Sequence, residues 1–174
     1  KRRESLGAVQ LIYKEADGCL RALDPIYGSA ETVPGANIYL INAIALSNLE
    51  LIQIDVPDLI LDKTLFGAEP AHGWCYFYAK AEIARQQNDW EGVVKLYKQA
   101  QENEFSASMP VENLPFIEAF AMTGDTDMAI KLTERTAKAQ EILCPALSTL
   151  WERVSRSQGS SAGVDTRLQD ACKP

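Results

Sequence analysis

The chain has 174 residues, of which 47% are hydrophobic and 24% are charged. This composition is typical of a globular protein and excludes a chain that is disordered throughout. The 24 acidic and 17 basic side chains give a formal net charge of −7. Because an acidic surface repels phosphate groups, we expect neither nucleic acid nor an anionic membrane surface as a partner. Solubility is the simplest interpretation of the charge.

The sequence contains no stretch that is long and apolar enough to cross a membrane. The most apolar segment, residues 38–54, also carries asparagine, serine, glutamate and glutamine, so we expect it in a protein core and predict no membrane insertion. The opening KRRESLG is basic, but no apolar segment follows it, unlike in a signal peptide. Because the chain begins with Lys1, we interpret it as a fragment or a processed product.

The first part of the chain is expected to form an irregular cap. Alternating apolar residues in 8–13 predict one short strand, and turn-forming residues follow it. Apolar residues at spacings of three and four then predict a helix over 37–53, with Asn37 as its N-cap. The Ser47–Asn48 pair is expected to kink or split this helix. The next stretch is rich in proline, glycine and acids and is interpreted as a connector with at most one helical turn.

The middle of the chain carries a clear helical pattern. Pro70 is suited to the first turn of the first helix, and Asp89 is suited to cap the second by accepting free amide protons. The predicted helices cover residues 70–87, 89–103, 110–123, 124–140 and 144–156. The tail that follows is rich in serine and glycine, so we expect it to be flexible.

Two segments of this region, NDWEGVVKLYKQA and GDTDMAIKLTERT, are similar and begin 36 residues apart, at residues 88 and 124. In each, a turn residue is followed by an aspartate that accepts the free amides of the next helix. Tandem units of this kind resemble tetratricopeptide repeats. The resemblance implies a mainly α fold in which antiparallel helical hairpins stack as a short solenoid over residues 70–157. An irregular N-terminal cap (1–69), with one short strand, precedes it, and a flexible tail (158–174) follows.

The chain departs from the tetratricopeptide pattern in three ways. Thr126 stands where the first unit has Trp90. The spacing is 36 residues rather than about 34. Only two units are visible, fewer than the three or so that normally form a self-sufficient stack. We therefore expect the N-terminal segment and the last helix to cap the two ends of the stack.

The four cysteines are far apart and contain no C-x-x-C pair: Cys19, Cys75, Cys144 and Cys172. This spacing is unlike that of a zinc ribbon or a thioredoxin-like redox site. An even number permits disulfides, but the spacing does not determine their connectivity. On composition alone, buried free thiols are slightly favoured.

A second resemblance concerns the segments GCLRALDP, LFGAEPAHGWCYFYAKAEIARQQNDWEGV and PFIEAFAMTGD. Together they resemble the carboxy-terminal soluble region of multi-span bacterial membrane proteins, including glycosyltransferase-like proteins of Chloroflexi-type bacteria. The resemblance implies a domain tethered behind transmembrane helices, on the extracytoplasmic face of the membrane, where Cys19 and Cys75 would form a disulfide. The basic KRR at the start favours the cytoplasmic side instead, which is the alternative location.

The sequence offers little for catalysis. Its only histidine, His72, lies three residues before Cys75, so the two side chains can touch on a helix. No nucleophile elbow or oxyanion motif surrounds them, and a structural role is the simpler interpretation. Three spaced acids, Asp55, Asp58 and Asp62, lack the ligand order of a calcium loop, and no phosphate-binding loop is present. We therefore expect no enzyme activity, no cofactor and no metal.

Binding is the remaining class of function. The first helices of a repeat line its concave surface, so Tyr76, Lys80, Asn113 and Glu118 are the candidate binding residues. We expect a non-catalytic module for protein–protein interaction or scaffolding, which binds a protein or peptide within a membrane-associated assembly. An apolar patch left uncovered at residues 38–54 would favour this function. The alternative is an accessory domain of a membrane glycosyltransferase-like enzyme whose active site lies outside this chain.

Overall fold

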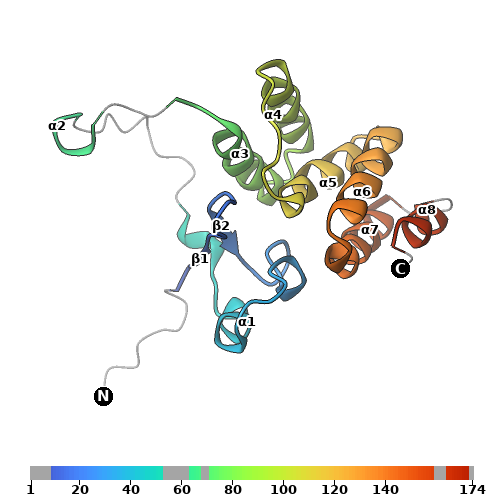
Figure 1. The fold of residues 1–174 in the computed structure, drawn as a ribbon, viewed down its shortest axis with the longest axis horizontal. Coiled ribbons are helices and arrows are strands. Elements are labelled where there is room, and N and C mark those ends of the chain that lie inside the picture. The colour runs from blue at the N-terminus through green and yellow to red at the C-terminus, as the bar shows by residue number, and fades with distance from the viewer. Residues whose placement is uncertain (1–8, 53–62, 68–70, 159–163, 173–174) are drawn as a thin grey trace.

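The structure, a computed structural model, describes residues 9–52, 63–67, 71–158 and 164–172. It is mostly helical, as predicted, and it has a small two-stranded sheet where one short strand was expected. An N-terminal module (residues 9–52) lies beside a row of packed helices, the helical body (71–158 and 164–172), as Figure 1 shows.

The N-terminal module consists of β1 (Leu11–Tyr13), β2 (Arg21–Leu23), the 3-10 helix η2 (Ala30–Thr32), α1 (Ile38–Ile44) and the 3-10 helix η3 (Leu49–Leu51). A single turn, α2 (Lys63–Phe66), follows in the predicted connector. The helical body consists of α3 (Trp74–Gln86), α4 (Trp90–Glu102), η4 (Pro110–Asn113), α5 (Leu114–Met122), α6 (Thr126–Ala139), η5 (Glu141–Leu143), α7 (Cys144–Gln158) and α8 (Val164–Ala171).

The N-terminal module has a small core of its own. β1 pairs antiparallel with β2, with Ile12 opposite Ala22. Leu23, Val33 and Ile44 are buried together beneath this hairpin and α1. The first strand was predicted and the second was not, because apolar residues alternate around β1, whereas β2 lies between the turn residues Asp17–Gly18 and Asp24–Pro25 and shows no alternation.

The helix predicted over 37–53 is shorter than expected. α1 ends at Ile44, and η3 follows only after the Ser47–Asn48 pair, where a break was predicted. The Asn48 backbone N–H donates to the Val9 carbonyl at 2.8 Å. This hydrogen bond places the chain alongside the segment that leads into β1, so the chain does not form another helical turn.

The helix starts follow local capping signals. Three helices begin after a side chain that accepts the backbone N–H three residues further on: Asn37, Asp89 and Asp125. These are the caps that the sequence indicates. α3 begins at Trp74, later than the predicted 70–87, because Gly73 before it is extended. Pro70 lies outside the described residues.

Helices α3 and α4 form one hairpin and α5 and α6 form a second, and α4 packs against α5 (Figure 1). Each hairpin turns at a residue with positive φ, Asn88 at 58° and Gly124 at 86°, which are the residues that the sequence alignment pairs. Asparagine and glycine adopt this left-handed conformation most readily. Pro115, which has no N–H to donate, lies at the start of α5, and the helix predicted over 110–123 is split there into η4 and α5.

All four cysteines are in disulfides, so the preference for free thiols is wrong. Cys19 is bonded to Cys75 and Cys144 to Cys172, with Cα–Cα distances of 5.2 and 5.9 Å. The second disulfide and the buried side chain of Leu168 hold α8 against the helical body, in the segment where a flexible tail was expected. Few large apolar residues are needed there because a covalent bond holds the helix end.

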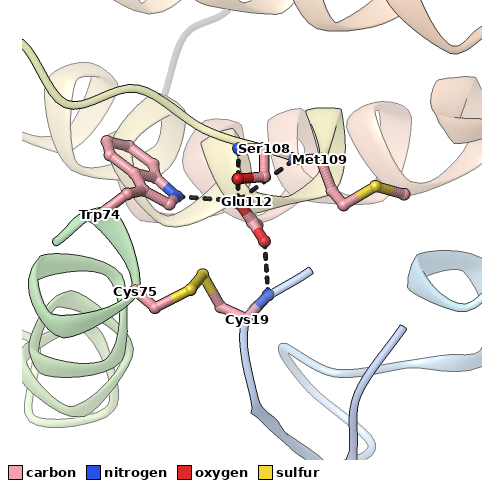
Figure 2. Close-up of a disulfide and its surroundings, with 6 residues drawn as sticks. All are labelled: Cys19, Trp74, Cys75, Ser108, Met109 and Glu112. Carbon is pink, nitrogen blue, oxygen red and sulfur yellow. Dashed lines mark hydrogen bonds between the residues drawn. A yellow bond between two sulfur atoms is a disulfide. The ribbon is translucent and has the colours of Figure 1, made fainter. Parts of the chain in front are cut away.

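The Cys19–Cys75 disulfide lies where the N-terminal module meets the helical body (Figure 2). Beside it, the carboxylate of Glu112 is only 1% exposed. It accepts hydrogen bonds of 2.7–3.3 Å from four donors: the backbone N–H groups of Cys19, Ser108 and Met109 and the indole Nε1–H of Trp74. These donors compensate for the burial of a charge and fix the module to α3 and η4.

Candidate functional site

Two of the residues predicted for binding, Tyr76 and Lys80, lie together on α3. The Lys80 ammonium is 4.8 Å from the centre of the Tyr76 ring, within range of a cation–π interaction. The Tyr76 ring also stacks on His72, with 3.6 Å between the ring centres. Tyr76 thus contacts two neighbours from its own part of the chain, one before it and one after it.

The other two, Asn113 and Glu118, are not on an open surface. Asn113 is 9% exposed, and its Nδ2 donates to the Thr136 hydroxyl at 3.2 Å. Glu118 is 3% exposed. A concave surface lined by first helices was expected, but the N-terminal module contacts α3 at Cys75 and Arg85 and α7 at Thr149 and Arg153. Glu118 pairs with these two arginines, and Asn113 is buried against α6, so both side chains contribute to packing rather than to an open groove.

A buried cluster of charges holds the module in that position. Arg85 of α3 is 2% exposed and approaches Glu82 at 3.1 Å and Glu118 at 3.4 Å. Arg153 of α7 donates two hydrogen bonds of 3.0 Å to Glu118. The ring of Tyr27, from the N-terminal module, packs against both guanidinium groups at 4.4 and 5.3 Å.

The electrostatics of this cluster favour a structural role. Burial would lower the pKa of Arg85, but Glu82 and Glu118 outweigh burial and raise it, so Arg85 stays charged. Burial also raises the pKa of Glu82, with Arg85 acting in the opposite direction, and it raises the pKa of Tyr27. Ion pairs of this kind compensate one another and are costly to break, which suits a fixed contact between two parts of a chain.

The one nucleophile considered in the sequence does not exist as a thiol, because Cys75 is bonded to Cys19. His72 stacks on Tyr76 instead of contacting a nucleophile. Among the described residues, no group of three or more histidine, cysteine or acidic side chains is arranged to hold a metal ion. The three acids that were considered as possible calcium ligands lie outside the described residues: Asp55, Asp58 and Asp62.

An open groove lies between α4 and α6, across the end of α5. It consists of two adjoining cavities of about 600 Å³ each. We call it the α4–α6 groove and define it by Glu91, Val94, Lys95, Tyr97, Lys98, Glu102, Phe120, Asp125, Asp127, Met128 and Lys131. A groove of this volume is large enough for several side chains of a bound peptide.

The floor of the α4–α6 groove is apolar. The rings of Tyr97 and Phe120 meet edge to face with 5.2 Å between their centres. Val94 and Met128 are partly buried in the same core. Burial raises the pKa of Tyr97, only partly opposed by Arg135, so its phenol keeps its proton at neutral pH. The floor is thus made of core side chains, with Tyr97 6% and Phe120 2% exposed, and its more accessible members are Val94 and Met128.

The rims of the groove carry charges of opposite sign. Lys95 and Lys98 are exposed on the α4 side, whereas Asp125 and Asp127 are exposed at the start of α6. Other charges lie further along each helix: Glu91 and Glu102 on α4 and Lys131 on α6. Each rim therefore carries charges of both signs, with two lysines and two glutamates along α4 and two aspartates and one lysine at α6.

This groove was missed at the level of sequence. The prediction assigned the binding surface to the first helix of each hairpin, whereas the groove is lined mainly by the second helices, α4 and α6. A signal was present in the alternation of apolar Val94 and Tyr97 with Lys95 and Lys98 along α4. The same pattern is found on any helix with one solvated face, so it does not by itself indicate a groove. The groove exists only because tertiary packing places α6 opposite α4.

Comparison with known protein families, with curated proteins and with solved structures finds no match for this chain. No related protein therefore supports either of the two resemblances seen in the sequence. Within the described part of the chain, no helix combines the length and the apolar character needed to span a bilayer.

Proposed function

We propose that this chain is a non-catalytic protein-binding module, and that its α4–α6 groove takes an amphipathic helix from a partner protein. One observation carries the proposal: a floor formed by Tyr97 and Phe120 lies between two charged rims, with Lys95 and Lys98 on the α4 side and Asp125 and Asp127 on the α6 side. Grooves with an apolar floor and charged edges are how helical proteins receive a partner helix. The floor supplies the affinity and the rims select the partner.

We propose that the helical body is a short tetratricopeptide-like stack, which would suit this function. The hairpins α3–α4 and α5–α6 repeat with an offset of 36 residues, and Asn88 and Gly124 turn them in the same way. α5 packs on α3, α4, α6 and α7, in the order expected of stacked hairpins. Such stacks present extended surfaces for protein ligands.

The rims specify the chemistry of the partner. A bound helix needs apolar residues at spacings of three and four, which contact the floor. The flank that faces Lys95 and Lys98 should be acidic, and the flank that faces Asp125 and Asp127 should be basic. If both flanks of the helix carried the same sign of charge, one flank would face residues of like charge and be repelled.

The two disulfides support a location in an oxidising compartment. We accordingly place the module on the extracytoplasmic face of a membrane-associated assembly. There it would hold a soluble segment of a neighbouring protein.

Three fluorescent helical peptides with the same leucine stripe test the proposal. One carries glutamate on one flank and lysine on the other, the second glutamate on both, and the third lysine on both. We expect the mixed peptide to bind most tightly in fluorescence anisotropy titrations. The double substitution K95E and K98E should weaken its binding about tenfold and shift the preference to the peptide with lysine on both flanks.

The matched control is the double substitution K14E and K138E. It changes the net charge equally at exposed positions outside the groove, so it should leave the order of the three peptides unchanged. If no peptide binds, or if the order is the same in both double variants, the proposal is wrong.

A further inference from the structure

Exposed apolar residues are concentrated in the N-terminal module. Among the described residues, the large hydrophobic side chains that are exposed in this module are Val9, Ile12, Leu20, Ile26, Ile38, Tyr39, Leu46 and Leu51. The helical body is far longer, yet among its described residues Ile142 is the only large hydrophobic side chain that is exposed. Apolar surface gathered in one place marks an interaction site more often than scattered residues do.

Helix α1 presents a continuous part of this surface. Its inner side, with Leu40 and Ile44, packs on the core of the module. Its outer side is exposed at Ile38, Tyr39 and Asn42, and Ala45 and Leu46 directly after its end are exposed as well; we call these five residues the α1 face. These positions have the spacing of residues that lie together on one side of a helix. Tyr39 is 83% exposed. A helix that is apolar on both sides is expected to be buried on both sides.

The α1 face carries no charge. No charged residue occurs between Glu31 and Glu50. Because the whole chain has a net charge of −7, two copies repel each other over most of their surfaces. An uncharged apolar face is where two copies can approach with the least electrostatic cost.

We propose that the α1 face docks against the same face of a second copy of this chain. In a two-fold pair, each residue meets its own equivalent or a near neighbour. Asn42, in the middle of the stripe, has both a donor and an acceptor in its amide, so it can pair with Asn42 of the second copy. A single asparagine within an apolar helix contact is known to fix the register of the two helices. The small Ala45 lets the helices come close.

A lipid surface fits the α1 face less well. Helices that lie in a membrane interface are rich in lysine and arginine on their polar side. The charged residues that flank this segment in the chain are instead two glutamates, Glu31 and Glu50. The face is therefore better suited to protein than to anionic lipid.

Sedimentation velocity from micromolar to millimolar concentration tests the proposal. We expect a reversible monomer–dimer equilibrium that salt strengthens, because salt screens the repulsion between two acidic copies. Y39D and N42D should each raise the dissociation constant of the dimer at least about tenfold. Asn42 and Tyr39 are exposed, so these changes should leave the fold intact, which circular dichroism checks. I142D adds the same charge at an exposed position of the helical body and should have no effect.

A mixing experiment tests the two-fold contact directly. Neither N42D nor N42K alone should dimerise, because like charges would meet at the centre of the contact. An equimolar mixture should form a heterodimer. A monomer at all concentrations, a mixture that stays monomeric, or association unchanged by Y39D and N42D would overturn the proposal. So would a monomer that binds phosphatidylcholine vesicles through Tyr39. Peptide binding in the α4–α6 groove should survive all these changes, so the two proposals can fail separately.

Discussion

The face formed by α3, α5 and α7 and the groove between α4 and α6 differ in what lies over them. The first is covered by the N-terminal module, and its charges are buried: Arg85 and Glu118 are 2% and 3% exposed. The second has an apolar floor, and its charges stand exposed along the rims. Residue types alone do not separate the two, since both contain aromatic rings, acids and bases.

The difference shows how neighbouring structure decides the role of a charged side chain. On the covered face, each charge must be matched by a partner, because an unmatched charge in the interior is expensive. On the open groove, water solvates the charges, so they cost little and remain available to a partner protein. Substitutions on the covered face should therefore change stability, and those at the groove should change binding.

The largest effect is expected from E118A. This change leaves Arg153, whose side chain is 22% exposed, without its carboxylate partner, and it leaves the buried Arg85 with Glu82 alone. We expect the free energy of unfolding to fall by about 3–5 kcal/mol, as for other broken buried ion pairs. Urea denaturation followed by tryptophan fluorescence measures it.

An exposed ion pair provides the control. Glu152 and Arg156 lie 3.9 Å apart and their side chains are 71% and 73% exposed. E152A should change the free energy of unfolding by less than about 0.5 kcal/mol. Similar losses in both variants would show that the covered face is not sealed from water, and the comparison between the two faces would fail.

The next largest effect is expected from removing the bond that holds the cover. Cys19 and Cys75 are 56 residues apart, and closing a loop of that length restricts the unfolded chain. The double substitution C19S and C75S should cost about 2–4 kcal/mol. Amide hydrogen exchange should also become faster at Tyr27 and Arg85, which meet where the N-terminal module contacts α3.

The second disulfide gives a matched comparison, since Cys144 and Cys172 are also joined across 28 residues. The double substitution C144S and C172S should loosen α8 and leave exchange at Tyr27 unchanged. Equal acceleration at Tyr27 in both double variants would mean that the first disulfide does not specifically hold the cover.

Much of the helical body could be predicted because its signals are local. The caps Asp89 and Asp125 act within one turn, and apolar spacing identifies helices whatever they pack against. The turn at Asn88 and Gly124 was equally visible, since it requires residues that tolerate positive φ. A break near Ser47 was expected for similar reasons.

The covered face could not be predicted because it depends on contacts between distant residues. Arg85 meets Tyr27 across 58 positions of the chain, and nothing local to either residue indicates the other. The pairing of Cys144 with Cys172 is of the same kind: composition favoured free thiols, and only the fold brings the two together. Glu118 was placed on an open surface because the sequence did not show that the chain buries this part of its first helices.

The smallest effect on stability is expected at the groove. The groove and the covered face can be compared directly by replacing one cation with alanine in each. K98A removes an exposed cation from the rim and should alter the free energy of unfolding by less than about 0.5 kcal/mol. R153A removes a cation from the covered face and should cost several times more, because Glu118 then loses two hydrogen bonds of 3.0 Å.

Thermal unfolding and peptide titration of the two variants should give opposite rankings. K98A should unfold like the parent chain but bind the mixed peptide more weakly, whereas R153A should be less stable but bind it normally. If K98A proves as destabilising as R153A, Lys98 belongs to the framework of the fold, and the groove is not a surface kept free for a partner.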